Sequence, residues 1–227
     1  MNHQTPTTPS PLLPSAKLGK GRPEGAEGRI IIDTLTEPAK RIEVQAGEKL
    51  TYIVPVLQSV TEPRHREIVL ADEGAEVEIV GLFLGYSEAT LALQIDTIHA
   101  APNTRGNTIF KAVLAGKSSL EFYGMIKIMK DAQNSNDFLQ QDSLLLSQDA
   151  KANAVPGLEI EANDVKASHG ATAKPVDPEQ KFYLMSRGLS EEQAEAMVVT
   201  GFLAPILKAI PNVEWKRKIS YAVDQLL

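Results

Sequence analysis

With 227 residues, 43% of them hydrophobic, and a net charge of −6, the chain is large enough for a packed domain and too acidic for a general nucleic-acid-binding protein. It contains no cysteine, which excludes a disulfide framework and a self-contained thiolate metal site. No secretory signal and no apolar run of the roughly 18 residues that a membrane span needs are visible, so we expect a cytoplasmic protein without a membrane partner.

Residues 1–28 are dominated by proline, glycine, threonine, serine and charged residues. Such a segment buries too little apolar surface to offset the entropy lost when it becomes ordered. We therefore expect a disordered or loosely attached arm.

Between residues 29 and 172 short apolar runs alternate with turn residues, a pattern that predicts a β domain. The stretch 120–129 shows the strand period of two, with Leu120, Phe122 and Ile126 on one face and Tyr123 on the other. Strands are expected over residues 30–32, 50–56, 68–70, 77–84, 91–98, 108–114, 120–129, 143–146 and 158–160.

A weak internal repeat distinguishes between two β architectures. The segment Val77–Gly81 is echoed by Leu120–Gly124 and, more faintly, by Leu158–Ala162. Self-similarity over several tens of residues is typical of stacked architectures and favours a parallel β-helix over a β-sandwich. Short strands and turns alone would also fit the sandwich.

Residues 173–227 switch to helical patterns and predict a small C-terminal helical domain. Asp177 is an expected N-cap, followed by Pro178 at the first helical position, and this helix should stop at Gly188. Ser190 opens a second helix with a capping box, and Pro205 should bend that helix. A third helix is expected from about residue 212. The expected apolar stripe of the second helix consists of Ala194, Met197, Val198, Phe202, Leu203 and Ile206.

Three histidines lie in the β domain or at its end. We expect His65 to be solvated in a charged loop and His99 to be satisfied by hydrogen bonds at a strand end. His169 lies at the junction with the helices, where an imidazole is equally suited to bind a metal, to shuttle a proton or to cap the solenoid. No phosphate-binding loop and no paired-histidine zinc motif is present, so the residues favour a binding or assembly protein over an enzyme.

From His99 onward, ordered sequence blocks resemble the SufB/SufD family of iron–sulfur cluster assembly proteins. Their order and spacing carry the resemblance, which covers a little over half of the chain. The blocks are His99–Thr104, Lys111–Ser119, Phe122–Ile126, Leu144–Ser147, Pro156–Lys166, Ser168–Thr172 and Phe182–Gly188.

The resemblance implies a right-handed parallel β-helix followed by a helical domain. It implies pairing, through the last coils, with a SufB-like chain or with an identical chain. It also implies that the helices bind a SufC-type ABC ATPase, and that His169 matches an interface histidine of the SufD type that is implicated in cluster assembly. The ATPase contacts implied in this way are Phe182, Tyr183, Leu184, Arg187 and Gly188.

The chain also departs from the family pattern. Gly170 follows His169, as in SufD-type members, whereas SufB-type members have a glutamate there and supply a cysteine for the cluster. Ala167 stands where many SufD-type members have a cysteine. Without a thiolate, the resemblance implies no tightly bound cofactor and an iron–sulfur cluster held only transiently, together with a partner chain.

The alternative from another class is a stand-alone β-helix protein that binds or cleaves carbohydrate. An aromatic content of 5%, the missing secretory signal and the lack of a focused carboxylate cluster argue against it.

Overall fold

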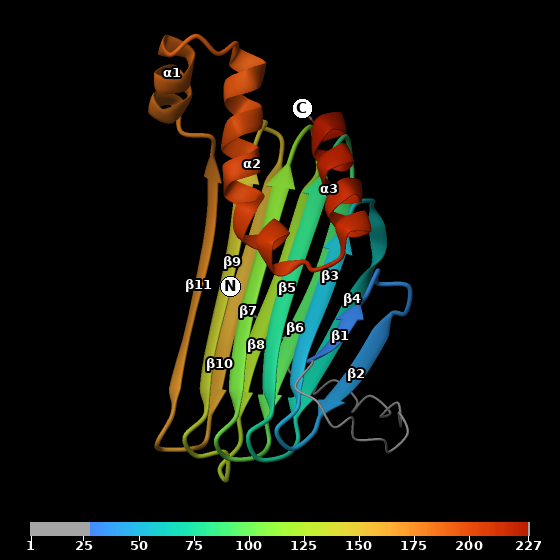
Figure 1. Ribbon diagram of the computed structural model, residues 1–227, viewed down its shortest axis with the longest axis vertical. Helices are drawn as coiled ribbons and strands as arrows, with labels where there is room; N and C mark the ends of the chain where they lie inside the picture. Colours follow the sequence, from blue (N-terminus) through green and yellow to red (C-terminus); the bar gives the residue numbers. More distant parts are fainter. Residues whose placement is uncertain (1–27, 227) are drawn as a thin grey trace, which may run out of the picture.

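The computed structural model describes residues 28–226, so the expected N-terminal arm lies outside the described residues except for Gly28. The described chain folds into eleven β-strands followed by three α-helices (Figure 1). The strands are β1 (Arg29–Ile32), β2 (Ala39–Val44), β3 (Lys49–Val56), β4 (Val60–Leu70), β5 (Glu76–Gly85), β6 (Thr90–His99), β7 (Arg105–Leu114), β8 (Ser119–Ile128), β9 (Asn136–Leu145), β10 (Lys151–Ile160) and β11 (Lys166–Pro175). The helices are α1 (Pro178–Ser186), α2 (Glu191–Ala209) and α3 (Val213–Leu226).

The strands form two parallel sheets that grow together along the chain. The odd-numbered strands follow the order β1-β3-β5-β7-β9-β11, and the even-numbered strands follow β10-β8-β6-β4-β2. Each turn of the chain therefore adds one strand to each sheet. The two sheets form the facing walls of a solenoid (Figure 1). This confirms the predicted mainly β, parallel solenoid followed by helices.

Each of the nine predicted strands overlaps an observed strand, and two observed strands, β2 and β11, were not predicted. Both lack the dense β-branched and aromatic content that predicts strands. The sequence of β2 is AKRIEV, and that of β11 is KASHGATAKP. Parallel pairing with β4 and β9, rather than local propensity, makes these two segments extended.

The sequence repeat that marks successive coils of the solenoid is found in its turns. Gly47, Gly74, Asn103 and Asn134 all have positive φ values, between 58° and 72°, and stand 27, 29 and 31 residues apart. Glycine and asparagine adopt this left-handed conformation at the least cost. Each of these residues donates its backbone N–H to the equivalent turn of the next coil, as Gly74 does to the carbonyl of Pro102. The echo used for the prediction is not this repeat, because Val77–Gly81 lies in β5 and Leu120–Gly124 in β8, which belong to different sheets.

Two hydrophobic cores hold the fold together. The first lies inside the solenoid, where the rings of Phe110 and Phe122 stack with centroids 4.8 Å apart. The second lies between the outer face of the odd-numbered sheet and the helices α2 and α3, which cover the upper part of that face in Figure 1. There Val80, Leu82 and Val113 pack against residues of α2 and α3. The helical domain is thus anchored on one face of the solenoid.

The helix signals in the sequence are confirmed. Asp177 accepts a hydrogen bond from the backbone of Glu179, and Ser190 and Gln193 form the reciprocal capping box. The last turns of α2, the helix that contains Pro205, run in a new direction (Figure 1). The predicted apolar stripe of α2 was wrong at one position, because Met197 is 51% exposed and Val199 is buried instead.

A polar network closes the N-terminal end of the solenoid. Leu35 is 2% exposed and packs into the interior core from the loop between β1 and β2. The buried Arg66 guanidinium holds this loop by donating to the Asp33 carboxylate, at 2.7 Å, and to the backbone carbonyl of Glu37, at 2.9 Å. Tyr52 also donates to Asp33. The loop between β1 and β2 thus fills the interior at this end, while β1 and β2 themselves are edge strands among the described residues.

Candidate functional site

The last coil, made of β10 and β11, is flatter than the coils before it. Its interior positions continue the rows of Phe122 and Leu139, which fill the preceding coil. Small side chains bring β10 and β11 into direct contact. The small interior residues are Ala152 and Ala154 on β10 and Ala167, Ala171 and Ala173 on β11. The solenoid thus narrows to a thin C-terminal end.

Both strands of this coil have a free edge. The N–H of Lys166 donates to Ser135 in the direction of β9, and the N–H of Lys151 donates to Ser118 in the direction of β8. Alternate residues of a parallel strand point their backbone groups to opposite neighbours. The backbone groups that point to the free edges, where the described chain has no further strand, are therefore those of Ala152, Ala154, Leu158, Ile160, Ala167, His169, Ala171 and Ala173.

Two prolines occupy free-edge positions as well. Pro156 lies in β10 and Pro175 ends β11, each in phase with the residues whose backbone groups point away from the sheet. A proline lacks a donor, and sheets tolerate it where no ladder hydrogen bond is lost. Their placement agrees with β10 and β11 being true edge strands.

His169 lies on β11 within this free edge. It continues the interior row of Leu139, which is buried, but His169 itself is exposed because no further described coil covers it. The next residue, Gly170, leaves room for the amide of Gln140, since an added Cβ would lie 2.5 Å from its Oε1. That amide donates to Asp142, which also accepts from Thr172. A polar row therefore flanks the histidine on the outer face.

Among residues 28–226 no group of three or more histidine, cysteine, aspartate or glutamate side chains is arranged to hold a metal ion. His169 is a single imidazole at an open edge. Any metal that it binds would need further ligands from outside residues 28–226.

The residues of the expected ATPase contact lie in and just after α1. Phe182 is 73% exposed and Tyr183 57% exposed, and the guanidinium of Arg187 lies 5.1 Å from the Tyr183 ring centroid. Leu184 instead packs against the core between helices and sheet. Gly188 has a φ of 99°, which ends α1. Phe182 and Tyr183 thus form the accessible apolar part of this segment.

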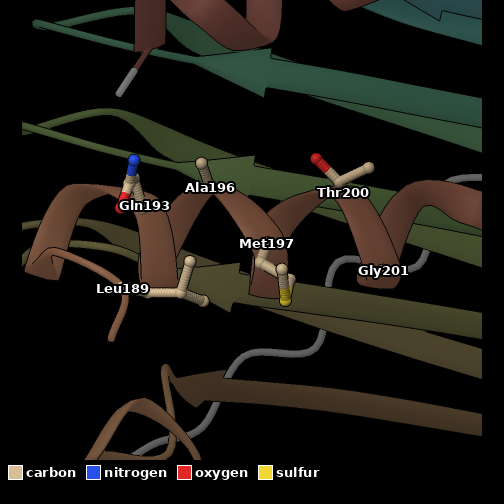
Figure 2. A pocket seen from close by; sticks show the side chains of 6 residues that line it. All are labelled: Leu189, Gln193, Ala196, Met197, Thr200 and Gly201. Atoms are coloured by element: carbon tan, nitrogen blue, oxygen red, sulfur yellow. The ribbon is translucent and has the colours of Figure 1, made fainter. Parts of the chain in front are cut away.

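A shallow groove of about 570 Å³ runs along α2 (Figure 2). An added Cβ on Gly201 would meet nothing within 4 Å, so the protein's own packing does not require a glycine there. A glycine inside a helix costs about 1 kcal/mol relative to alanine. The groove is lined by Leu189, Gln193, Ala196, Met197, Thr200 and Gly201.

The structure does not bring His169 and the α1 segment together. Pro175 lies six positions after His169 on β11, which corresponds to about 20 Å along a strand. α1 lies beyond the C-terminal end of β11 (Figure 1). The edge and the helices are therefore two separate surfaces.

The other two histidines of the solenoid are accounted for by hydrogen bonds. His99 is fully buried and pairs with Thr104 at 2.7 Å and with Asp137 at 2.9 Å, as expected for a satisfied strand-end histidine. Burial raises the pKa of the Asp137 carboxyl in spite of its hydrogen bond with His99. The prediction for His65 was wrong, because this residue lies within β4 and bonds Asp96 at 2.8 Å.

Sequence reasoning missed the free edges and the α2 groove. The alanine-rich sequence of β11 indicates a coil without large interior side chains, but it does not indicate that the strand lacks a neighbour. The groove is lined by exposed and half-buried residues of α2 together with Leu189, and no sequence motif marks it. No helix among the described residues has the length and hydrophobicity needed to cross a membrane.

Comparisons with known proteins identify related chains. Residues 33–202 match the family described as SUF system FeS cluster assembly, SufBD core domain. An iron–sulfur cluster assembly SufBD family protein of Mycobacterium tuberculosis is 31% identical over 172 residues, which are 76% of this chain and 20% of that protein. A Synechocystis protein of the same description is 35% identical over 136 residues, which are 58% of this chain and 28% of that protein.

A third relative, from Staphylococcus epidermidis and also described as an iron–sulfur cluster assembly SufBD family protein, is 27% identical over 188 residues, 82% of this chain and 40% of its own length. The chain thus spans between 20% and 40% of the length of these relatives. The comparisons do not favour the carbohydrate-binding alternative.

Proposed function

The chain belongs to the SufBD family of iron–sulfur cluster assembly proteins, and we propose that it acts as a SufD-like, non-enzymatic scaffold subunit. It pairs through its last coil with a SufB-like or an identical chain. It recruits a SufC-type ABC ATPase through α1 and α2. The observation that carries this proposal is the pair of free strand edges at the C-terminal end of the solenoid.

Edge pairing follows from the chemistry of the backbone. An exposed strand edge presents a row of unpaired N–H and C=O groups that another strand can complete. β10 and β11 each present such an edge on the same coil, so one partner can extend both sheets at once. The opposite end of the solenoid also has two edge strands, β1 and β2, but they are only 4 and 6 residues long, against 10 residues each for β10 and β11. The longer edges favour pairing at the C-terminal end.

The cluster is cargo that this chain holds only together with its partner. The 227 residues contain no cysteine, so thiolate ligands must come from outside them. His169 supplies an exposed imidazole at the free edge, next to the place where the partner strand binds. Neutral imidazole is a competent ligand for iron. His169 thus contributes one ligand to a shared site.

Replacing His169 with alanine should lower the amount of cluster in the mixed complex severalfold without unfolding the protein, because the side chain is exposed and contributes little packing. Co-expression with a SufB-like chain and the ATPase, followed by iron and sulfide analysis of the purified complex, measures this. Ser168→Ala on the neighbouring outer-face position is the matched control. An unchanged cluster content in His169→Ala would assign the histidine a structural role only. A cluster reconstituted on this chain alone would contradict the need for a partner's thiolates.

The helical surface predicts where the ATPase binds. Phe182→Glu places a charge on the exposed part of α1 and should weaken co-purification of the SufC-type ATPase by on the order of tenfold, because an apolar anchor is lost. Val213→Glu, on the equally exposed start of α3, should leave binding unchanged. Equal binding by both variants would exclude α1 from the contact, and a wild-type chain that binds no ATPase would contradict the proposed recruitment.

A further inference from the structure

We propose that Lys166 and Lys174 select the partner of the last coil: they disfavour pairing of β11 with a second copy of this chain and favour a partner edge that carries acidic side chains. This inference rests on the proposed pairing and deepens it. It concerns which chain binds rather than where binding occurs.

The charges of β11 all have one sign. The ten residues of this edge strand include Lys166 and Lys174 and no acidic residue. The two lysines lie on the same, outward face of the strand, eight residues apart, and both are exposed. Neither forms an ion pair within residues 28–226, unlike Lys127, which bonds Glu159 at 2.7 Å next to the other edge. The positive charge of β11 is therefore left for a partner to neutralise.

The β11 strand of a second copy does not neutralise it. Two identical edge strands that pair across a two-fold axis run antiparallel. Whenever residue i of the first copy faces residue j of the second, residue j of the first copy also faces residue i of the second. Pairing centred on Gly170 sets Lys166 opposite Lys174 of the other copy, twice. Shifting the register by two residues removes this direct opposition. The strand pair still contains four positive charges and no negative one.

Charges of the same sign directly opposite each other destabilise a strand pair, whereas opposite charges stabilise it. Lysines are also a common device by which edge strands avoid indiscriminate pairing. Here the lysines distinguish one partner from another. A partner edge with glutamate or aspartate at the facing positions is attracted, whereas a second copy of β11 is repelled. The edge strand β10 has no excess of positive charge, since it carries both Lys151 and Glu159, and it therefore does not select a partner by charge.

A charge swap between two copies of this chain tests the selection directly, whatever the natural partner is. The double variant Lys166→Glu/Lys174→Glu is mixed with wild-type chain that bears a different tag. The mixed pair should associate on the order of tenfold more tightly than either chain with itself, since two repulsive pairs become attractive. The gain should shrink in high salt. Capture of one tag and quantification of the other measures it, with thermal unfolding of the variant as a check of folding.

The control is Lys117→Glu/Lys130→Glu, two exposed turn lysines with the same change in net charge. An equal gain with this control, or no gain with the edge variant, would overturn the selection by Lys166 and Lys174. A SufB-like chain that still binds wild-type and swapped chains equally well would also overturn it while leaving the proposed pairing intact. If neither chain associates with itself, with the other or with a SufB-like chain, the proposed pairing fails as well.

Discussion

Replacing Ala171 with proline should weaken pairing at the last coil by at least about tenfold while the solenoid stays folded. The backbone N–H of Ala171 points to the free edge of β11, because the N–H of Lys166, five residues earlier and in the opposite phase, donates to Ser135 toward β9. Proline removes this donor and places its ring where a partner strand would lie. We expect association to weaken by at least about tenfold, since an edge donor and the close approach of the backbones are both lost.

The neighbouring position provides the matched control. The N–H of Thr172 has the same phase as that of Lys166 and points to β9, so Thr172→Pro removes a bond within the protein's own ladder. Ala171→Pro should therefore change association and leave the unfolding temperature nearly constant, and Thr172→Pro should lower the unfolding temperature. Sedimentation velocity and thermal unfolding separate the two effects. Normal pairing by Ala171→Pro would show that partners do not bind along β11.

The sequence was sufficient to predict most of the strands and the helix ends, because these depend on local chemistry. Ser190 and Gln193 specify a capping box within four residues, and the observed hydrogen bonds follow it. The short apolar runs between turns specify strands in the same local way. The family resemblance further predicted the parallel solenoid and the surfaces at His169 and Phe182.

What the sequence did not predict depends on pairing between residues about thirty positions apart. β11 is extended because it lies on β9, although its own residues have weak strand propensity. The exposure of Met197 depends on how α2 is rotated about its own axis against the sheet. The helical periodicity did not determine this rotation, which buries Val199 in place of Met197. The free edges depend on which strands lack a neighbour in the folded chain. No local pattern marks such an absence.

The network at the closed end is the clearest long-range case. Asp33 and Arg66 are 33 residues apart, in a loop and in β4, and no motif connects them. Both side chains are buried, and Tyr52 adds a third hydrogen-bonding partner. Burying a charge is costly unless it is paired, so each partner depends on the others. This end of the solenoid is therefore stabilised by a contact that only the folded chain creates.

Asp33→Ala should lower the free energy of unfolding by about 3 kcal/mol or more, because it leaves the buried Arg66 guanidinium without its counter-ion. Asp33→Leu combined with Arg66→Met should cost less than Asp33→Ala alone, since no unpaired charge then remains. Urea unfolding at neutral pH measures both variants. A cost of Asp33→Ala below about 1 kcal/mol would mean that water reaches Arg66 and that the network does not seal this end.

The same carboxylate predicts a pH dependence. Burial alone would raise the pKa of Asp33, but the hydrogen bonds from Arg66 and Tyr52 outweigh it and hold the pKa below its ordinary value. Because the folded-state pKa is the lower one, this stabilisation is fully present above the unfolded value of about 3.9 and is lost as the pH falls through the folded-state pKa. Wild type should therefore lose stability below about pH 4, and Asp33→Asn should lack this part of the loss. Acid unfolding of both proteins, followed by circular dichroism, distinguishes them, and identical acid profiles would show that other carboxylates govern the transition.

Pairing along β11 should be unaffected in the Asp33 variants at temperatures where they remain folded, because the two ends of the solenoid act independently.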